Sequence, residues 1–260
     1  MLLSRLPGAD RLWWKIAMPV KRLTNGPWSM SRSRAALRTA TGYSDAASAG
    51  GVRYVILGAE GGVVPVALIR HGPTVWNEQK RLQGRADIPL SPDGLAAVRR
   101  WRVPEAFAGF EWLASPLSRA AQTAALLDLD AAAEPAIVEM HWGDWDGHTH
   151  AELQQKYGDG FRGRAGAGLD LRPPGGESLR EVRRRAQGWL AEVAARGRPT
   201  GAVTHQVVIR AVLSLATGWT MEGAPPHALD WASMHLFTVA ADGTVSIDRL
   251  NISLTTACPI

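Results

Sequence analysis

Residues 66–74, VALIRHGPT, join a short apolar and partly β-branched stretch directly to Arg70, His71 and Gly72. This pattern predicts a buried strand that ends in a turn and delivers Arg70 and His71 to its carboxyl end. Ligands of open α/β sheets bind outside the carboxyl ends of the strands. There a guanidinium can hold two phosphate oxygens while a neighbouring imidazole attacks phosphorus. The stretch therefore indicates a phosphate site, although an ordinary polar turn after a strand has the same composition.

The rest of the chain alternates between predicted strands and predicted helices. This order favours an α/β fold, a three-layer αβα sandwich around a mostly parallel sheet. Asp242-Gly243 between two apolar stretches predicts a hairpin. Strands are predicted at residues 64–69, 110–114, 201–204, 234–240 and 244–250, and helices at residues 92–103, 115–127 and 207–217.

Local sequence signals mark where several helices begin. Ser91-Pro92 and Ser115-Pro116 each combine an N-cap residue with a proline in the first helical position. Thr149-x-x-Glu152 and Ser178-x-x-Glu181 are capping boxes. The second box opens a long helix with a helical apolar period. Its apolar face consists of Leu179, Val182, Ala186, Trp189, Leu190 and Val193.

Positive charge is concentrated in the first part of the chain. The 260 residues have a formal net charge of +5, but residues 1–50 alone contain eight basic and two acidic side chains. The remaining 210 residues contain 21 basic and 22 acidic side chains, so the high isoelectric point belongs to the amino-terminal segment. The main body therefore lacks the basic footprint of a nucleic-acid-binding protein, and we expect no nucleic-acid partner.

Residues 1–63 show no sustained helical or strand period, and three interpretations stand side by side. They form a disordered basic extension, or they form an arginine-rich targeting or membrane-surface segment. In the third interpretation, which we favour slightly, the natural product starts at Val64 from an alternative initiation codon. In each case we expect one domain at residues 64–260, a length that suits a single globular core.

Cysteine usage and hydropathy restrict the remaining classes of protein. Cys258 is the single cysteine, which excludes an intrachain disulfide framework and a multi-cysteine zinc site. It is compatible with a reducing compartment, so we expect a cytoplasmic protein. No apolar run approaches the length needed to span a bilayer. We expect a monomer or homodimer that acts on a small molecule.

Further polar residues follow the predicted strands or lie in the first loop. Arg119 is placed on the first turn of a helix after a strand, where the helix amino end already favours an anion. Thr204-His205 ends a short strand, which repeats the geometry of Arg70-His71. Glu139 lies in a loop too aromatic to be a simple solvated turn. Three residues of the first loop are candidates to hydrogen-bond a phosphate or its ester oxygen, namely Asn77, Gln83 and Gly84.

Taken in order, these residues resemble the histidine phosphatase superfamily, in the branch that includes the phosphoglycerate mutases. The resemblance extends from about Val64 to Leu250. Its motifs are Arg70-His71-Gly72-x-Thr74, Asn77, Leu82-Gln83-Gly84, Asp87-x-x-Leu90, Ser115-Pro116-Leu117-x-Arg119-Ala120-x-x-Thr123-Ala124, Glu139, Gly143-x-Trp145-x-Gly147, Pro174-Gly175-Gly176-Glu177-Ser178 and Val203-Thr204-His205-x-x-Val208-Ile209-Arg210.

The resemblance implies a mechanism without a metal or cofactor. In it, His71 is the nucleophile that becomes phosphohistidine, while Arg70, Arg119 and His205 complete the phosphate pocket. Glu139 is the implied proton donor and acceptor. His71 must be neutral at its attacking nitrogen, so a backbone carbonyl is expected to hold its other N–H. The implied substrate-binding residues are Thr74, Asn77, Gln83, Gly84 and Gln206.

Two positions depart from the family pattern. Pro73 has no N–H to donate to phosphate. Gln206-Val207 replaces the small residues that usually follow the second histidine, and this bulkier pair is expected to narrow the pocket or tilt His205. The implied activity is hydrolysis of a small phosphomonoester. Two features resemble the phosphatase branch, namely Gln83-Gly84 and the lack of a long insert before residues 173–178. The stretch from Arg172 to Ser178 is similar to a stretch of the α-ribazole phosphatases.

Other functions remain as alternatives. Phosphoryl transfer of the phosphoglycerate mutase type uses the same residues, and a catalytically weak member of the fold would act as an interaction module. A metal cluster is not favoured, because its histidines lack the i, i+4 spacing on a helix that metallohydrolases use. The candidate metal ligands are His141, Asp144, Asp146, His148 and His150.

Overall fold

The computed structural model describes residues 62–161 and 166–255, so the interpretations of residues 1–63 concern a segment that lies almost wholly outside the described residues. The described chain forms a six-stranded sheet in the order β3-β2-β4-β1-β5-β6. The strands are β1 (Val64–Arg70), β2 (Glu111–Ala114), β3 (Ala131–Ala133), β4 (Thr200–Thr204), β5 (Ser233–Val239) and β6 (Val245–Ser253).

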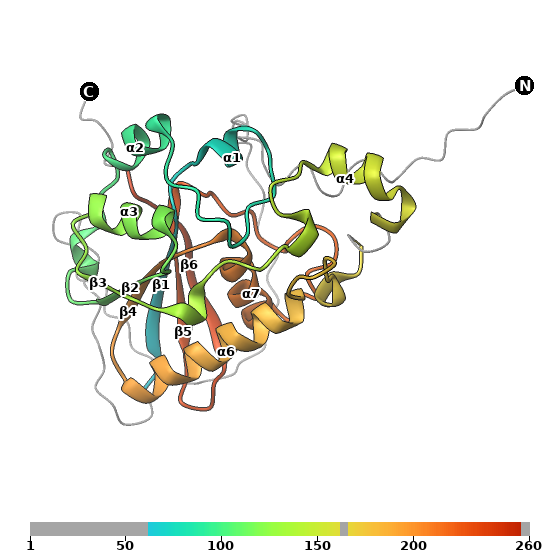
Figure 1. Ribbon diagram of the computed structural model, residues 1–260. Helices are drawn as coiled ribbons and strands as arrows, with labels where there is room; N and C mark the ends of the chain where they lie inside the picture. Colours follow the sequence, from blue (N-terminus) through green and yellow to red (C-terminus); the bar gives the residue numbers. More distant parts are fainter. Residues whose placement is uncertain (1–61, 162–165, 256–260) are drawn as a thin grey trace, which may run out of the picture. The chain divides into compact units, whose positions relative to one another are not determined.

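Helices cover both faces of this sheet (Figure 1). The pairs α2–α3 and α6–α7 each pack together. Helix α3 contacts β2, β3 and β4, whereas α7 contacts β1 and β6. The α-helices are α1 (Val75–Glu78), α2 (Pro92–Val98), α3 (Ser118–Leu126), α4 (His150–Tyr157), α6 (Leu179–Arg196) and α7 (Gln206–Thr217). Short 3₁₀ turns are η3 (Glu105–Phe107), η4 (Pro135–Ile137), η5 (Gly143–Trp145) and η6 (Gly168–Asp170).

The predicted fold class is confirmed. Four neighbouring strands, β3, β2, β4 and β1, are parallel, and β5 runs antiparallel to both β1 and β6. The hairpin between β5 and β6 turns at Gly243, whose φ of 83° suits glycine. The sheet is therefore mostly parallel, and most of its polar strand ends meet at one edge.

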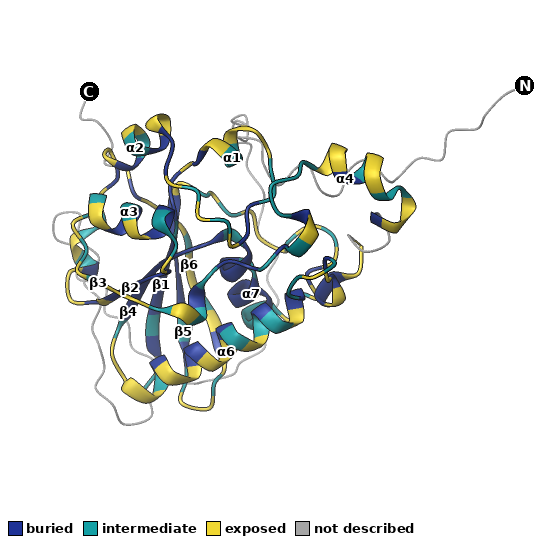
Figure 2. Ribbon diagram, in the orientation of Figure 1, coloured by how far each residue is buried: buried dark blue, intermediate teal, exposed yellow. Residues whose placement is uncertain are grey.

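The long helix α6 shows how closely the apolar pattern predicts burial. Its capping box is formed at Ser178 and Glu181. Its buried residues are the six that the sequence places on one face, Leu179, Val182, Ala186, Trp189, Leu190 and Val193. Figure 2 shows the same alternation as buried and exposed stripes along the helix. The capping box at Thr149 and Glu152 is also formed and begins α4.

Two helix boundaries differ from the sequence prediction. The helix predicted at residues 92–103 ends at Val98, because the chain then turns so that Trp101 bridges to Thr255. Pro104 also disfavours a helical conformation at Val103. The helix predicted from Ser115 begins at Ser118, whose N–H donates to Asp87 Oδ1 at 2.7 Å. Asp87 of the first loop thus caps the helix in place of Ser115, and the Ser115 side chain is available for a different contact.

One strand was not predicted at all. β3 consists of Ala131–Ala133, which pairs in parallel with β2 at the edge of the sheet. Alanine favours helices and is depleted in strands, so the local sequence gives no strand signal. The strand depends on its partner rather than on its own side chains.

Candidate active site

The two histidines that follow strands lie side by side. β1 and β4 are adjacent and parallel, with Arg70 paired to Thr204, so the next residues leave the sheet at the same edge. The His71 backbone N–H donates to the Thr204 carbonyl at 2.9 Å. The ring centroids of His71 and His205 are 5.2 Å apart. The strand-end geometry predicted from the sequence is therefore present.

His71 has one ring nitrogen fixed and one free. Its Nδ1 lies 2.7 Å from the Gly72 carbonyl, so Nδ1 carries the proton and donates. No residue of the described chain hydrogen-bonds its Nε2, and the side chain keeps 5% exposure. Burial, then the charges of Arg70 and Arg119, hold the pKa of His71 well below its ordinary value. At neutral pH, His71 is thus an unprotonated imidazole with its Nε2 lone pair available.

His205 is held differently. Its Nε2 lies 2.7 Å from Ser115 Oγ, and its Nδ1 is buried without a hydrogen-bond partner among the described residues. Burial is again the main reason why its pKa lies well below the ordinary value, and a proton on His71 would lower it further. The serine that the sequence assigns to a helix cap instead contacts the second histidine. Val207 beside it is buried, and its N–H points to Glu139 Oε2 at 3.4 Å.

Two arginines supply positive charge next to these rings. Arg119, the second residue of α3, is fully buried and donates to the carbonyls of Ala86 at 3.0 Å and Gly84 at 2.7 Å. The Nε atoms of Arg70 and Arg119 are buried without a hydrogen-bond partner in the described chain. Burial lowers the pKa of Arg70 to about 10 and also lowers that of Arg119. The arginines are therefore oriented cations with unused donors, which suits an anion.

Glu139 lies in the loop between η4 and η5 and is 4% exposed. One carboxylate oxygen accepts from the Met140 N–H at 2.7 Å. Burial raises the pKa of Glu139, while the hydrogen bond from Met140 and the charge of Arg119 oppose this rise. A carboxyl group in this position can hold a proton closer to neutral pH than an exposed one can, which is what an acid catalyst needs.

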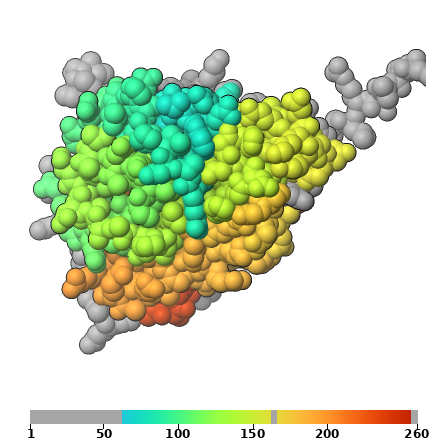
Figure 3. Space-filling view, in the orientation of Figure 1, coloured from blue at the N-terminus to red at the C-terminus, as the bar shows by residue number. Residues whose placement is uncertain are grey.

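A salt bridge fixes the loop that carries Glu139. Arg185 of α6 binds Glu177 with Nε 2.8 Å from Oε1, and it also donates to the Ala136 carbonyl at 2.7 Å. Glu177 exchanges backbone and side-chain hydrogen bonds with His141. The loop is thus tied to α6 on both sides of Glu139. Figure 3 shows the cyan segment after β1 on this face of the protein, bordered by green and yellow residues.

The first-loop residues form a connected group. Thr74 caps α1 and exchanges hydrogen bonds with Asn77. The Thr74 hydroxyl also donates to Gln83 Oε1 at 2.8 Å, which leaves Gln83 Nε2 buried and without a partner. Gln83 therefore has an unused donor. Whether Thr74, Asn77 and Gln83 touch a substrate stays a prediction.

Gly84 differs from the expectation that it donates to phosphate. Its N–H donates to Asp146 at 2.8 Å, and its carbonyl accepts from Arg119. A side chain there would come within 2.8 Å of the Met140 carbonyl oxygen, so only glycine allows this approach. The arrangement favours a role in orienting Arg119 and in packing the first loop against the loop of Glu139.

Sequence reasoning gave no role to two further residues. Arg210, one helical turn after Gln206 on α7, lies over the Trp231 ring with its guanidinium carbon 5.5 Å from the centroid. The Arg70 guanidinium carbon is 5.4 Å from the same centroid. With the Gln206 amide oxygen turned toward it, Arg210 donates from Nη1 and Nη2 at 3.2 Å each. The i, i+4 spacing of Gln206 and Arg210 indicates their pairing, but nothing local points to Trp231.

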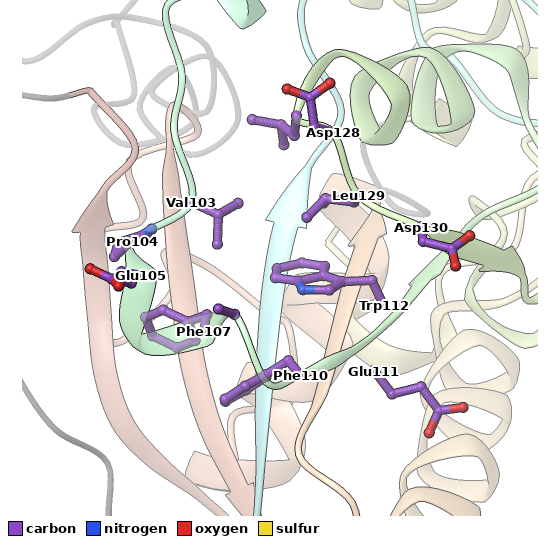
Figure 4. Close-up of a pocket in the computed structure, with 12 residues that line it drawn as sticks. Val103, Pro104, Glu105, Phe107, Phe110, Glu111, Trp112, Asp128, Leu129 and Asp130 are labelled. Carbon is purple, nitrogen blue, oxygen red and sulfur yellow. The ribbon is translucent and has the colours of Figure 1, made fainter.

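A pocket of about 590 Å³ lies at the opposite end of the sheet, beside the amino ends of β2 and β3 (Figure 4). It contains none of the candidate active-site residues, and its acidic side chains would repel a phosphate. It is lined by Val103, Pro104, Glu105, Phe107, Ala108, Phe110, Glu111, Trp112, Leu127, Asp128, Leu129 and Asp130.

Within residues 62–161 and 166–255, no three His, Cys, Asp or Glu side chains come together in a group that could hold a metal ion, and this includes the five candidates at residues 141–150. No helix in the described part of the chain has both the length and the hydropathy to cross a membrane.

Several proteins of known name are similar to this chain. It is 31% identical over 198 residues to 2,3-bisphosphoglycerate-dependent phosphoglycerate mutase 2 of Gloeobacter violaceus, covering 70% of this chain and 88% of that protein. Phosphoserine phosphatase 1 of Hydrogenobacter thermophilus is 30% identical over 163 residues, 60% of this chain and 77% of that protein. A bifunctional protein of Mycobacterium tuberculosis is 31% identical over 208 residues, 75% of this chain but 55% of that protein, so this chain spans about half its length.

Solved structures share the fold. YhfR of Bacillus stearothermophilus superposes with a TM-score of 0.63 at 25% identity, covering 75% of this chain and 98% of that one. A putative α-ribazole-5′-phosphate phosphatase of Escherichia coli has a TM-score of 0.61 at 20% identity, covering 75% of this chain and all of that one, which supports the fold alone. A sequence model described as histidine phosphatase superfamily (branch 1) matches residues 66–253. With both histidines and both arginines of its motifs at one sheet edge, the chain belongs to the histidine phosphatase superfamily.

Proposed function

We propose that this protein is a metal-independent phosphomonoester hydrolase that acts on a small phosphorylated metabolite through a phosphohistidine intermediate. The observation that carries the proposal is the state of His71, whose Nδ1–H is held by the Gly72 carbonyl while Nε2 is unoccupied among buried cations. A neutral imidazole so oriented is a nucleophile, and the cations beside it can stabilise the charge of a transferring phosphoryl group.

In the first step, the Nε2 lone pair of His71 attacks phosphorus and the bond from phosphorus to the ester oxygen breaks. The electron pair of that bond goes to the leaving oxygen, which takes the proton of Glu139. Arg70, Arg119 and His205 hold the phosphoryl oxygens during the transfer. The raised pKa of Glu139 supports its part, because the group must be protonated before it can donate.

In the second step, a water molecule attacks the phosphoryl group of phosphohistidine. Glu139, now a carboxylate, takes a proton from this water, and the bond between Nε2 and phosphorus breaks. The products are inorganic phosphate and an imidazole ready for another turnover. Alcohol and phosphate leave separately, so the scheme is a ping-pong hydrolysis.

A mutase reaction is the second candidate. It is favoured by the likeness to the Gloeobacter mutase, and it would use the same phosphohistidine with a phosphorylated sugar acid as acceptor in place of water. Hydrolysis is favoured by the likeness to named phosphatases and by the lack of a long insert before residues 173–178. A cytoplasmic location and a monomeric or dimeric state stay predictions from the sequence.

The proposal is tested by assaying hydrolysis of p-nitrophenyl phosphate with and without EDTA, in the wild type and in His71→Ala. His148→Ala is the control variant, because it removes a histidine that lies outside the strand-end site and is one of the candidate metal ligands of the alternative reading. We expect turnover that resists EDTA, persists in His148→Ala and disappears in His71→Ala.

A product analysis then separates the two candidate reactions. With 3-phosphoglycerate as substrate, hydrolysis gives glycerate and inorganic phosphate, whereas a mutase gives 2-phosphoglycerate. Turnover that survives in His71→Ala would contradict the phosphohistidine mechanism, and loss in EDTA would restore a metal mechanism. Folded wild-type protein without turnover on any phosphomonoester would favour the interaction module.

A further inference from the structure

Arg210 is a third buried cation at the strand-end site, and the two-step mechanism does not use it. Its Nε has no hydrogen-bond partner, and it forms no salt bridge with a carboxylate in the described part of the chain. With the Gln206 amide oxygen turned toward Arg210, the terminal nitrogens of Arg210 donate to this neutral amide. Burial, followed by the charge of Arg70, lowers the pKa of Arg210 to about 10. A guanidinium without a counterion is costly to bury, so its retention calls for an explanation.

Trp231 places this cation beside the phosphate pocket. Arg70 and Arg210 both lie over the Trp231 ring, at 5.4 and 5.5 Å from its centroid. Cation–π contacts with one ring hold the two like charges near each other. The charges of Arg70 and Arg119 act on His71, and all three arginines interact with Glu139. The shared ring therefore places Arg210 beside Arg70 at the edge of the phosphate pocket.

The charges of the site leave room for a second anion. Arg119 lies near the negative charges of Asp87 and Asp146 as well as Glu139. Glu139 is the carboxyl group that acts on Arg210, and it is neutral when it is ready to donate its proton. A phosphate dianion balances two positive charges. Arg210 then has no counterion, whereas Arg119 also donates to the carbonyls of Gly84 and Ala86.

We propose that Arg210, held by Gln206 and stacked on Trp231, binds a second anionic group, a carboxylate or a phosphate, on the leaving group of the substrate. This inference rests on the proposed function and narrows its substrate to phosphomonoesters that carry a further acidic group. Gln206 then acts as a positioning residue for Arg210. An uncharged nucleoside as leaving group, such as α-ribazole, gains nothing from this contact.

The test compares ligands that differ in one acidic group. Binding is measured by calorimetry to His71→Ala, which does not turn the ligands over, for 3-phosphoglycerate against glycerol 3-phosphate and for fructose 1,6-bisphosphate against fructose 1-phosphate. The first pair reports a carboxylate and the second a phosphate. We expect at least one acidic ligand to bind about tenfold to hundredfold more tightly than its partner, the usual strength of charge-assisted hydrogen bonds.

Arg210→Met in the same background is expected to bring this ratio close to one, and Arg210→Lys to retain part of it, because lysine keeps the charge but not the two-pronged donor. Arg184→Met is the matched control, since Arg184 is exposed on α6 and its loss changes the net charge equally. Thermal melting shows whether each variant folds, and Arg210→Gln serves if the methionine variant does not.

The outcomes separate this inference from the proposed function. A ratio that is the same in the Arg210 variants, or no preference in either ligand pair, overturns the second-anion site even if the protein is a phosphatase. A preference that depends on Arg210 in a protein without phosphatase activity upholds the site and overturns only the reaction.

Discussion

The two strand-to-turn units that carry His71 and His205 look alike in sequence but leave their imidazoles in opposite states. Both histidines follow adjacent parallel strands, and both are buried with a pKa well below the ordinary value. His71 uses Nδ1 for a backbone carbonyl and leaves Nε2 free. His205 uses Nε2 for Ser115 and leaves Nδ1 buried without a described partner. The hydrogen bond on the other ring nitrogen therefore decides which imidazole can act as a nucleophile.

The partners of each ring explain this difference. A carbonyl can only accept, so Gly72 fixes the tautomer of His71 by its chemistry alone. A serine hydroxyl can donate or accept, so Ser115 accommodates either form of His205. The imidazole of His71 is thus held in the tautomer that can attack phosphorus. The imidazole of His205 can donate a hydrogen bond to a bound phosphate and can become protonated when a negative charge lies beside it.

The largest effect is expected from His71→Gly. Removing the nucleophile should lower kcat by on the order of 10⁴-fold or more, because the neighbouring imidazole of His205 has its Nε2 bound to Ser115 and its Nδ1 buried. Added imidazole should restore part of the activity by occupying the space of the lost ring. His205→Gly should show no such rescue. Equal rescue of both variants would contradict the assignment of His71 alone as the nucleophile.

His205→Asn should have the next largest effect. In the proposed mechanism His205 contacts the phosphate oxygens but is not the attacking group, so the expected loss in kcat/KM is about 10²–10³-fold. Asparagine keeps one donor in the same region. A rapid burst of the first product should still be seen in quenched-flow experiments, because phosphorylation of His71 does not require His205 as nucleophile. If the burst is lost while slow turnover remains, His71 is not the histidine that becomes phosphorylated.

The pH dependence of stability should report both buried rings. In the folded protein their pKa lies well below the value of 6.5, whereas in the unfolded chain it returns close to that value. The unfolded chain therefore takes up protons first as the pH falls, and stability is full above about pH 6.5 and declines below it. Each ring contributes a slope of up to about 1.4 kcal/mol per pH unit.

Glu139 acts in the opposite sense, because its raised pKa means that the folded state binds a proton before the unfolded chain does. Urea unfolding of wild type and His205→Asn between pH 8 and pH 5.5 separates these contributions. The variant should show a shallower decline below pH 6.5. An identical decline in the two proteins would show that His205 is not held neutral.

The smallest effect is expected from Ser115→Ala. It removes the partner of His205 Nε2, and a buried polar atom left without a hydrogen bond costs about 1–3 kcal/mol of unfolding free energy. Activity should fall by about tenfold or less, because His205 remains in place. Ser118→Ala, which breaks an exposed hydrogen bond to Asp87, is the control. If Ser115→Ala destabilises no more than this control, Ser115 does not hold His205.

Much of this arrangement could be predicted because strand ends are visible in sequence. An apolar stretch that stops at Arg70-His71 or at Thr204-His205 places those residues at the carboxyl edge of a parallel sheet. The position of Arg119 on the first turn of α3 follows from the same logic, and so does the buried face of α6. These features depend on local patterns, which a single sequence contains.

Features that depend on distant partners could not be predicted. Ser115 carries a strong helix-start signal, yet Asp87 takes over the cap and frees the serine for His205. The alanines of β3 form a strand only because β2 pairs with them. Trp231 reaches the site from a segment without a sheet or helix period, so its contact with Arg70 and Arg210 appears only in the fold.

The central claim is that His71 attacks through Nε2, and it is tested most directly by trapping the intermediate. Wild-type protein is mixed with a rapidly reacting aryl phosphate and quenched in alkali, and the phosphorylated peptide is examined by mass spectrometry and ³¹P NMR. The structure predicts phosphohistidine at His71 with phosphorus on Nε2. Phosphorus on Nδ1, phosphorylation of His205, or a burst of phenol without any phosphorylated histidine would contradict it.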